Sequence, residues 1–306
     1  MNKVLIADSV SSAVSEVFDK NGIAYDTKIG LSEDELTTEI TEYSGLIVRS
    51  AVTVTEKIIN SASNLKVIGR PGVGVDNVDL KAATNNGIVV MNTPLGNVQA
   101  TAELTFGIMH SLMRKISNAN QSMHQKKWEK KKFIGNEMYG KTIGIIGFGN
   151  IGKKVSQIAH AYGMNVLVYS ASISPEDEKK FNVTNQSIDD ILEGADIITF
   201  HNKLSENSKY LINSNAITKM KKNAIIINCA RGGLVNEKDI KEALEKGNIA
   251  GYGCDVYENE PEQDSIFSSM DNVVMTPHIG ASTIEAQEKV AYQIAEQIVE
   301  FLKNNK

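Results

Sequence analysis

Short apolar runs alternate with longer amphipathic segments along almost the whole chain. Several of these runs, such as IIIN and IITF, are apolar at consecutive positions, which is typical of parallel strands that helices cover on both faces. Alternation of this kind predicts a doubly wound α/β fold. The predicted strands lie at residues 4–7, 24–28, 45–48, 67–69, 88–91, 142–146, 165–169, 196–200, 224–228, 249–254 and 273–276.

The amphipathic segments between the strands begin and end at recognisable capping residues. Asn236 precedes one helical segment and Gly247 follows it, which provides a cap at each end. Ser282 and Glu285 predict a capping box at the start of the last helix, whose pattern does not decide on which sheet it packs. A long helical pattern from Val98 to about residue 121, followed by the polar segment KKWEKKKF, separates the strands into two series. We therefore predict two sheets rather than one.

Length and composition restrict the class of protein. At ~150 residues per domain, 306 residues suggest about two domains. The net charge of −5 provides no large positive field for nucleic acids or anionic membranes. No stretch approaches ~18 uninterrupted apolar residues, and the first apolar run is too short for a secretory signal. Cys229 and Cys254 make neither a disulfide framework nor a zinc site, so we expect a soluble cytoplasmic protein without metal, nucleic acid or membrane.

A glycine-rich turn, GFGNIG, connects the predicted strand 142–146 to a helical segment. Its three glycines permit a tight turn, let backbone N–H groups approach a pyrophosphate, and let the helix pack closely on the strand. The pyrophosphate then rests on the positive end of the helix. In this context the turn predicts a dinucleotide site rather than a glycine-rich turn without a ligand. The residues expected to contact the dinucleotide there are Gly147, Gly149, Asn150, Ile151 and Gly152.

The cofactor preference depends on Ser170, at the end of the second strand of this series. A carboxylate at that place binds the adenosine ribose and repels a 2′-phosphate, whereas a serine offers only a neutral hydrogen bond. No arginine follows nearby to bind a 2′-phosphate, and the nearest basic residues are Lys179 and Lys180. We predict that NAD is the cofactor, with weaker selectivity against NADP than an acidic residue provides.

Three ionisable residues, Arg231, Glu260 and His278, each lie just past a late strand. Ligands of open α/β sheets bind at the carboxyl ends of strands, so these side chains can converge. Hydride transfer between a 2-hydroxy acid and a nicotinamide needs a cation for the carboxylate, a group that titrates near neutral pH, and a carboxylate that orients it. Considered one at a time, each also has a structural interpretation. Arg231 is then a surface ion-pair residue, Glu260 a solvated loop residue and His278 a structural histidine.

Together with GFGNIG, the segments NCARGGLVNE, GYGCDVYENEP and TPHIGAST resemble the D-isomer-specific 2-hydroxyacid dehydrogenases over nearly the whole chain. The resemblance implies that Arg231 anchors the substrate, that His278 donates and accepts the proton, and that Glu260 is its partner. It also implies that Ala230 and Asp255 bind the cofactor, with Asp255 near the nicotinamide carboxamide.

The same resemblance implies two doubly wound parallel-sheet domains, one inserted in the other. A Rossmann cofactor domain, residues 97–281, interrupts a flavodoxin-like substrate domain made of residues 1–96 and 282–306. The chain is expected to form a homodimer. Because it ends at Lys306, it is also expected to lack the C-terminal regulatory domain of some family members.

Within the family, LIVRSAVTV, GRPGVGVDNVDLKAAT, VVMNTPLGN and KKWEKKKFIGNEMYGKT resemble members that oxidise 3-phosphoglycerate to 3-phosphohydroxypyruvate in serine biosynthesis. The basic run from Lys126 to Lys132 is either a solvated face or helps to hold a phosphorylated substrate across a dimer interface. The sequence departs from the family pattern at Pro71, Lys130, Ser170 and Lys203. The implied substrate-binding residues are Arg49, Arg70, Val73, Gly74 and Lys130.

Other functions stay open at this point. The chain could reduce another 2-keto acid, such as glyoxylate or hydroxypyruvate, or oxidise formate or phosphite, although the carboxylate of Glu260 disfavours formate. It could also be a non-catalytic NAD-sensing module, like the corepressors that share this scaffold. Turnover with a hydroxy acid distinguishes an enzyme from a sensor.

Overall fold

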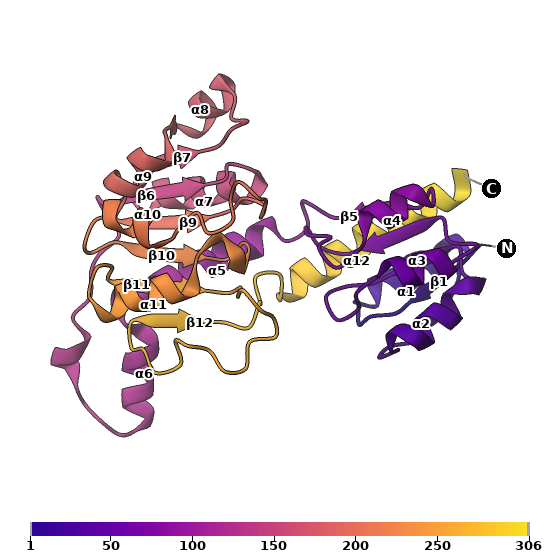
Figure 1. Ribbon diagram of the computed structural model, residues 1–306, viewed down its shortest axis with the longest axis horizontal. Helices are drawn as coiled ribbons and strands as arrows, with labels where there is room; N and C mark the ends of the chain where they lie inside the picture. Colours follow the sequence, from indigo (N-terminus) through magenta and orange to yellow (C-terminus); the bar gives the residue numbers. More distant parts are fainter. Residues whose placement is uncertain (1, 305–306) are drawn as a thin grey trace. The chain divides into compact units, whose positions relative to one another are not determined.

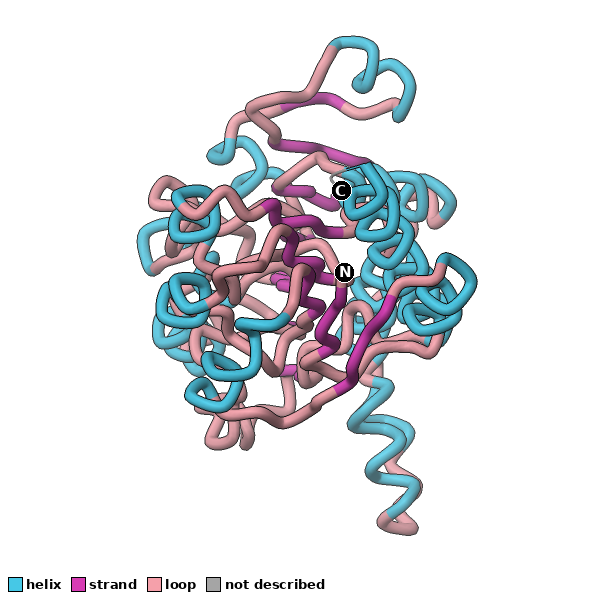
Figure 2. Tube along the Cα trace, turned by 90° about the vertical axis from the view of Figure 1, so that its right-hand side faces the viewer, coloured by secondary structure: helices cyan, strands magenta, loops and turns pink. Residues whose placement is uncertain are grey.

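The computed structural model describes residues 2–304, which form two compact units. The first unit contains Met1–Val98 with Ala281–Lys306, and the second contains Gln99–Gly280. The junctions lie at 98/99 and 280/281, where the sequence suggests 96/97 and 281/282. Residues 1, 305 and 306 of the expected ranges lie outside the described part of the chain. In each unit, helices cover a sheet on both faces (Figures 1 and 2).

The sheet of the first unit is fully parallel, in the order β2-β1-β3-β4-β5 (Figure 1). Alternate residues of β1 face opposite layers: Leu5 packs with α2, α3 and α4, whereas Val4 and Ile6 pack with α1 and α12. This two-sided burial explains the unbroken apolar runs. The strands are β1 (Lys3–Ile6), β2 (Ala24–Thr27), β3 (Gly45–Ile47), β4 (Val67–Arg70) and β5 (Val89–Asn92). The helices are α1 (Ala13–Asn21), α2 (Glu33–Glu39), η1 (Ile40–Glu42), α3 (Glu56–Ser61), α4 (Leu80–Asn85) and α12 (Ile284–Asn304).

The last helix, α12, packs on the sheet of the first unit. Gly69 in β4 permits this contact, because a Cβ there would lie 2.6 Å from Ile298 Cδ1 and 2.8 Å from Ile294 Cγ1. The Thr283 hydroxyl accepts the Ala286 N–H at 3.1 Å, so Thr283 caps the helix, and the expected cap at Ser282 is wrong by one residue. The strand order is that of the flavodoxin-like fold, as the sequence predicts.

The second unit has a parallel sheet in the order β12-β11-β10-β9-β6-β7-β8. The chain runs from β6 outward to one edge and then returns to β9 for the other half, so a topological switch point lies between β6 and β9. This is the Rossmann order, and the predicted fold class is confirmed. The strands are β6 (Thr142–Ile146), β7 (Asn165–Tyr169), β8 (Thr184–Asn185), β9 (Ile197–Phe200), β10 (Ile225–Asn228), β11 (Gly251–Cys254) and β12 (Val273–Met275).

Two features of the second unit differ from the sequence-based expectation. The strand β8 is missed because its two residues are exposed and carry no apolar pattern. The helical pattern after Val98 is broken at Lys115, whose φ of 52° ends the first helix. Near this break, the Met113 carbonyl accepts the N–H of Asn136, from the segment between α6 and β6, at 2.8 Å. Within residues 2–304, no helix is both long and apolar enough to cross a membrane.

The helices of the second unit cover both faces of its sheet (Figure 2). The helix α6 and the loop that follows it extend away from this sheet (Figure 1). The helices are α5 (Val98–Arg114), α6 (Ile116–His124), η2 (Lys130–Phe133), α7 (Asn150–Ala161), α8 (Pro175–Phe181), α9 (Ile188–Gly194), α10 (Ser214–Lys219), η3 (Gly232–Leu234) and α11 (Glu237–Glu245).

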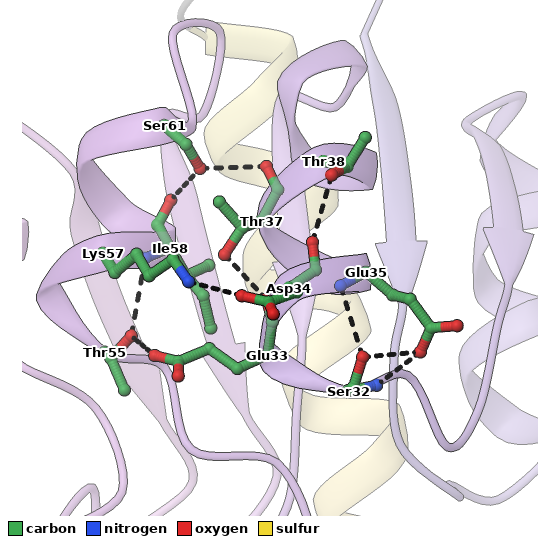
Figure 3. A network of polar contacts seen from close by, with 10 residues as sticks. All are labelled: Ser32, Glu33, Asp34, Glu35, Thr37, Thr38, Thr55, Lys57, Ile58 and Ser61. Atoms are coloured by element: carbon green, nitrogen blue, oxygen red, sulfur yellow. Dashed lines mark hydrogen bonds and ion pairs between the residues drawn. The ribbon is translucent and has the colours of Figure 1, made fainter.

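A polar network joins α2 to α3 on the surface of the first unit (Figure 3). Ser32 and Glu35 form a reciprocal capping box at the start of α2, and the Thr55 hydroxyl caps α3. The Thr55 hydroxyl also donates to Glu33, and Lys57 pairs with Asp34. These bonds hold the two helices against each other without burying any charge.

Candidate active site

The glycine-rich turn after β6 has the geometry that its sequence predicts. Gly147 has a φ of 99°, and a Cβ there would lie 2.5 Å from the backbone N of Asn202. At Gly152 a Cβ would lie 2.1 Å from the carbonyl oxygen of Gly147, so this glycine lets α7 approach the strand. Both positions therefore require glycine for packing within the protein.

Gly149 differs from the other two glycines, because a Cβ there would meet nothing within 4 Å. It is exposed and precedes α7, whose first turn has no side-chain cap. Asn150 is also exposed, and Ile151 is half-buried. The first turn of this 12-residue helix thus offers unpaired N–H groups and a positive dipole end beside open space, which suits a phosphate.

The loop after β9 lies against this turn and carries two buried polar atoms without a partner. These are the Nδ1 of His201 and the Oδ1 of Asn202. The Nε2 of His201 contacts the Thr199 hydroxyl at 3.0 Å, and burial lowers the pKa of the ring to about 3. The Asn202 oxygen is an acceptor beside the open turn. It therefore has the chemistry to accept a hydrogen bond from a ligand hydroxyl.

Ser170 lies at the end of β7, as the sequence predicts. Its backbone N–H donates to Asn185 Oδ1 at 3.1 Å, and its hydroxyl accepts the Ser172 N–H at 3.4 Å. Lys153 pairs with Asp177 at 2.9 Å, and Lys180 lies over the ring of Phe181. The end of β7 thus carries a neutral hydroxyl at the position where a carboxylate or an arginine would discriminate between the two dinucleotides.

Arg231 follows β10 and precedes η3. Its Nη1 donates to the Ala230 carbonyl at 2.6 Å, and its own carbonyl accepts the Asn228 amide at 2.9 Å. The neighbouring Cys229 is a buried free thiol, and burial raises its pKa to about 12. At this strand end the thiol therefore stays neutral, and the guanidinium of Arg231 is the charged group.

Glu260 and His278 meet at the ends of β11 and β12. His278 Nδ1 lies 2.6 Å from Glu260 Oε2, and the Tyr257 N–H donates to the other carboxylate oxygen at 3.1 Å. Burial alone would raise the pKa of Glu260, but the hydrogen bond and charge of His278, with the Tyr257 N–H and Arg231, hold it below its usual value. With Nδ1 on the carboxylate, the half-exposed ring keeps Nε2 for proton exchange.

His278 has a φ of 52°, in the left-handed region that non-glycine residues rarely adopt. Asp255 holds the loop in this conformation: its carboxylate accepts the Thr276 hydroxyl at 2.6 Å and the N–H groups of Ile279 and Gly280, each at 2.7 Å. Asp255 has no exposed surface, and burial raises its pKa in spite of these donors. It therefore lies behind the histidine loop rather than at its surface.

Tyr257 links the two loops of this pair. Its backbone N–H binds Glu260, and its hydroxyl donates to the Thr276 carbonyl at 2.9 Å, two residues before His278. The sequence analysis did not single out Tyr257, Asn202 or Thr276. A search for any polar residue just past a strand, rather than for ionisable ones alone, would have found Asn202 and Tyr257, whereas Thr276 lies within the predicted strand 273–276.

The first unit contains the expected substrate-binding residues Arg49, Arg70, Val73 and Gly74. Arg49 lines an open hollow of about 450 Å³ with Ser11 and the first turn of α12. Arg70 Nε donates to Asn77 Oδ1 at 3.2 Å, and the Asn77 amide binds the Arg49 carbonyl, so one asparagine connects the two arginine segments. The Val73 carbonyl accepts the Asn92 amide at 2.6 Å, and Gly74 is half-buried in the same loop.

Lys130 lies in η2 and is exposed, on the segment that extends from the sheet of the second unit. Its neighbour Lys132 pairs with Glu129 at 2.6 Å. Among residues 2–304, no group of three or more His, Cys, Asp or Glu side chains is arranged to hold a metal ion.

Comparison with known proteins identifies relatives of the whole chain. A family model described as "D-isomer specific 2-hydroxyacid dehydrogenase, NAD binding domain" matches residues 106–280. The chain is 43% identical over 305 residues to a D-3-phosphoglycerate dehydrogenase of Bacillus subtilis (strain 168), and 45% identical over 302 residues to one of Synechocystis sp.. These alignments cover 99% of this chain but 57% and 54% of the two relatives, so the chain spans little more than half of their length.

A solved structure shares the architecture of both units. The TT0316 protein of Thermus thermophilus superposes with a TM-score of 0.91 at 30% identity. The superposition covers 99% of this chain and 97% of that one.

Proposed function

Because the chain belongs to the D-isomer-specific 2-hydroxyacid dehydrogenases, we propose that it transfers a hydride between NAD and a small D-2-hydroxy acid. The observation that carries this proposal is the 2.6 Å bond between His278 Nδ1 and Glu260 Oε2. An oriented histidine is the acid–base group that interconversion of a hydroxyl and a carbonyl requires. A neighbouring strand end supplies Arg231 as the cation for the carboxylate.

Groups in the second unit support the binding of NAD. The uncapped first turn of α7, with Gly147, Gly149, Asn150, Ile151 and Gly152, suits the pyrophosphate. The unpaired Oδ1 of Asn202 and the Ser170 hydroxyl are candidates to bind ribose hydroxyls, and Ala230 and the loop that Asp255 holds are candidates for the nicotinamide end. Bound there, NAD would supply the acceptor for the hydride that leaves C2 of the hydroxy acid.

The side chains of this chain handle the proton and the substrate charge. In oxidation, neutral His278 accepts the hydroxyl proton at Nε2 while Glu260 holds Nδ1–H and stabilises the imidazolium that forms. In reduction, the same imidazolium returns the proton to the carbonyl oxygen. Arg231 binds the substrate carboxylate through its planar fork and polarises the neighbouring carbonyl.

We propose 3-phosphoglycerate as the substrate, with 3-phosphohydroxypyruvate as the product. The Bacillus subtilis and Synechocystis relatives described above are both named for this substrate. Arg49, Arg70 and Lys130 supply cationic groups for a phosphorylated acid, and Val73 and Gly74 supply backbone beside Arg70. A reductase of glyoxylate or hydroxypyruvate is the alternative, because the Arg–Glu–His set serves any 2-hydroxy acid.

Steady-state assays with NAD and a panel of hydroxy and keto acids test this proposal. We expect the highest kcat/KM with 3-phosphoglycerate, and a marked loss of kcat/KM for unphosphorylated acids. Faster turnover of glyoxylate or hydroxypyruvate would overturn 3-phosphoglycerate as the substrate but leave the proposed hydride transfer unchanged. Binding of NADH without turnover of any acid would favour a non-catalytic NAD-sensing module and contradict the proposal that the chain is an enzyme.

Two glycines provide a matched test of the cofactor site. Gly149→Ala places a Cβ in open space, so we expect unchanged thermal stability but a KM for NAD raised about tenfold or more by the lost room for pyrophosphate. Gly147→Ala, which meets the Asn202 backbone, should instead lower stability.

Ser170→Asp should weaken use of NADP by charge repulsion and spare NAD. A wild-type preference for NADP above ~100-fold (about 2.7 kcal/mol) would overturn the assignment of NAD.

We also infer a homodimer. The segment from α6 to residue 139 exposes several large apolar side chains on a part of the second unit that extends from its sheet (Figure 1). These side chains are Ile116, Met123, Trp128, Ile134 and Tyr139. Sedimentation of the wild type should give a dimer, and Trp128→Glu with Ile134→Glu should give a monomer.

A further inference from the structure

Glu258 forms an unusual reciprocal contact with the start of α11. The Glu237 N–H donates to Glu258 Oε1 at 3.0 Å, and the Glu258 N–H donates to Glu237 Oε1 at 2.9 Å. Each carboxylate therefore satisfies the backbone of the other residue, although the two carry the same charge. The Glu258 carboxylate also lies at the positive end of α11, where a negative charge is favoured.

A third segment binds the same carboxylate. The hydroxyl of Tyr210, in the loop after β9, donates to Glu258 Oε2 at 3.0 Å. Tyr210 has a φ of 50°, and its N–H donates to the Gly233 carbonyl at 2.8 Å. This strained residue is thus held at both its backbone and its side chain.

The peptide that joins Tyr257 to Glu258 packs directly on Gly232. A Cβ at Gly232 would lie 1.9 Å from the Tyr257 carbonyl carbon and 2.5 Å from the Glu258 nitrogen. Gly232 follows Arg231, and Tyr257 donates its N–H to Glu260. The segment around Glu258 therefore joins the backbone next to Arg231 to the backbone that holds Glu260.

We propose that Glu258 is a positioning residue: its carboxylate clamps the Glu260 loop onto α11 and Tyr210, and so keeps Glu260 aligned with His278. This inference rests on the proposed function. Burial, together with the charges of Glu258 and Glu262, raises the pKa of Glu237, so electrostatic repulsion opposes the clamp. The reciprocal N–H bonds outweigh that repulsion in the folded chain.

Kinetics of Glu258→Ala test the clamp. Because Glu258 is exposed, the variant should fold, and Asp264→Ala removes a carboxylate from the same loop as a matched control. We expect Glu258→Ala to lower kcat about tenfold, the scale of one or two lost hydrogen bonds, with the KM for NAD within about twofold. The limb of the pH profile that reports the Glu260–His278 pair should shift as well. Asp264→Ala should match the wild type.

Two conservative variants separate the clamp from a general structural role. In Glu258→Gln the amide still reaches both the Glu237 N–H and the Tyr210 hydroxyl, so kcat should recover to within about threefold of the wild type. Tyr210→Phe should lose about twofold to threefold in kcat. Wild-type kcat in Glu258→Ala overturns the proposal. Equal loss in the Ala and Gln variants, or loss that only follows a lower melting temperature, overturns it too.

Hydrogen exchange distinguishes failure of the clamp from failure of the proposed function. Without substrate, Glu258→Ala should lose protection of the backbone amides of Tyr257 and of position 258, while Asp264→Ala should not. If the wild type turns over no acid, the proposed function fails, and exchange alone still decides whether the clamp exists. Unchanged protection in Glu258→Ala overturns the clamp and leaves the reaction unaffected.

Discussion

The polar network between α2 and α3 and the network at the ends of β9 to β12 use the same chemical groups. Both consist of carboxylates, hydroxyls and backbone N–H groups, but they differ in exposure. The side chains of Asp34 and Lys57 in the first network are 84% and 55% exposed (Figure 3). In the second network, Asp255 and Asn228 have no exposed surface.

The networks also differ in the backbone that they hold. Between residues 32 and 61, no described residue has a positive φ, and the bonds cap helix ends, lie within a helix or join α2 to α3. At the strand ends, His278 and Tyr210 are held in the left-handed region, and buried atoms of His201 and Asn202 have no partner. Strain and unpaired polar groups cost stability, so their presence at these strand ends indicates a site shaped for a ligand rather than for the fold.

The largest expected effect is on catalysis at the strand ends. His278→Ala should lower kcat by at least ~10²-fold, the usual scale for loss of an acid–base group. Because the ring is half-exposed, the melting temperature should stay close to that of the wild type. Glu260→Gln should reduce kcat less, because the amide still orients the ring. Near-normal kcat in His278→Ala, measured in both directions, would remove this residue from the mechanism.

The next effect is on folding. Asp255→Asn keeps the shape of the side chain, but its amide NH₂ points toward at least one of the groups that donate a hydrogen bond to the Asp255 carboxylate. We expect a loss of about 1–3 kcal/mol in the free energy of unfolding, because a buried donor is left unsatisfied. Urea unfolding of the variant and the wild type gives this difference. A loss below about 0.5 kcal/mol would mean that the loop does not depend on this carboxylate.

A pH dependence should also distinguish the buried strand ends from the surface network. Burial lowers the pKa of His201 from 6.5 to about 3, so the unfolded chain binds a proton in this range and the folded chain does not. Stability should therefore fall between pH 6.5 and 3, by up to about 1 kcal/mol per pH unit. His201→Asn should flatten this slope, whereas the same change at the exposed His124 should leave it unchanged. Equal slopes in the two variants would contradict the burial of His201.

The smallest effects are expected between α2 and α3. Thr55→Ala removes the cap of α3 and should cost about 1 kcal/mol. Lys57→Ala breaks an exposed ion pair and should leave the melting temperature within about 1 °C of the wild type. Differential scanning calorimetry of both variants makes the comparison. A larger loss for Lys57→Ala than for Thr55→Ala would reverse our assignment of the network to helix capping.

Much of the fold was predictable because its signals are local. Apolar runs such as IIIN marked the buried strands, and Asn236 marked the start of α11 through its side-chain cap. The turn at Gly147 was predictable from its glycine pattern between a strand and a helix, although the contact that requires glycine there, with the Asn202 backbone, is not local. The missed strand β8 and the unexpected break at Lys115 show the limit. The first has no apolar pattern, and the second depends on the Asn136 N–H, far along the chain.

The sequence by itself determined the fold class, the dinucleotide turn and the residue types of the candidate site. The reason is that hydrophobic periodicity and the residues just past each strand can be recognised from consecutive residues. Only the tertiary structure decided what joins those residues. It placed α12 on Gly69, put Asp255 behind the His278 loop, and brought Glu258 against both Glu237 and Tyr210. These contacts link segments far apart in the chain, and their geometry depends on side-chain packing and burial that no local pattern records.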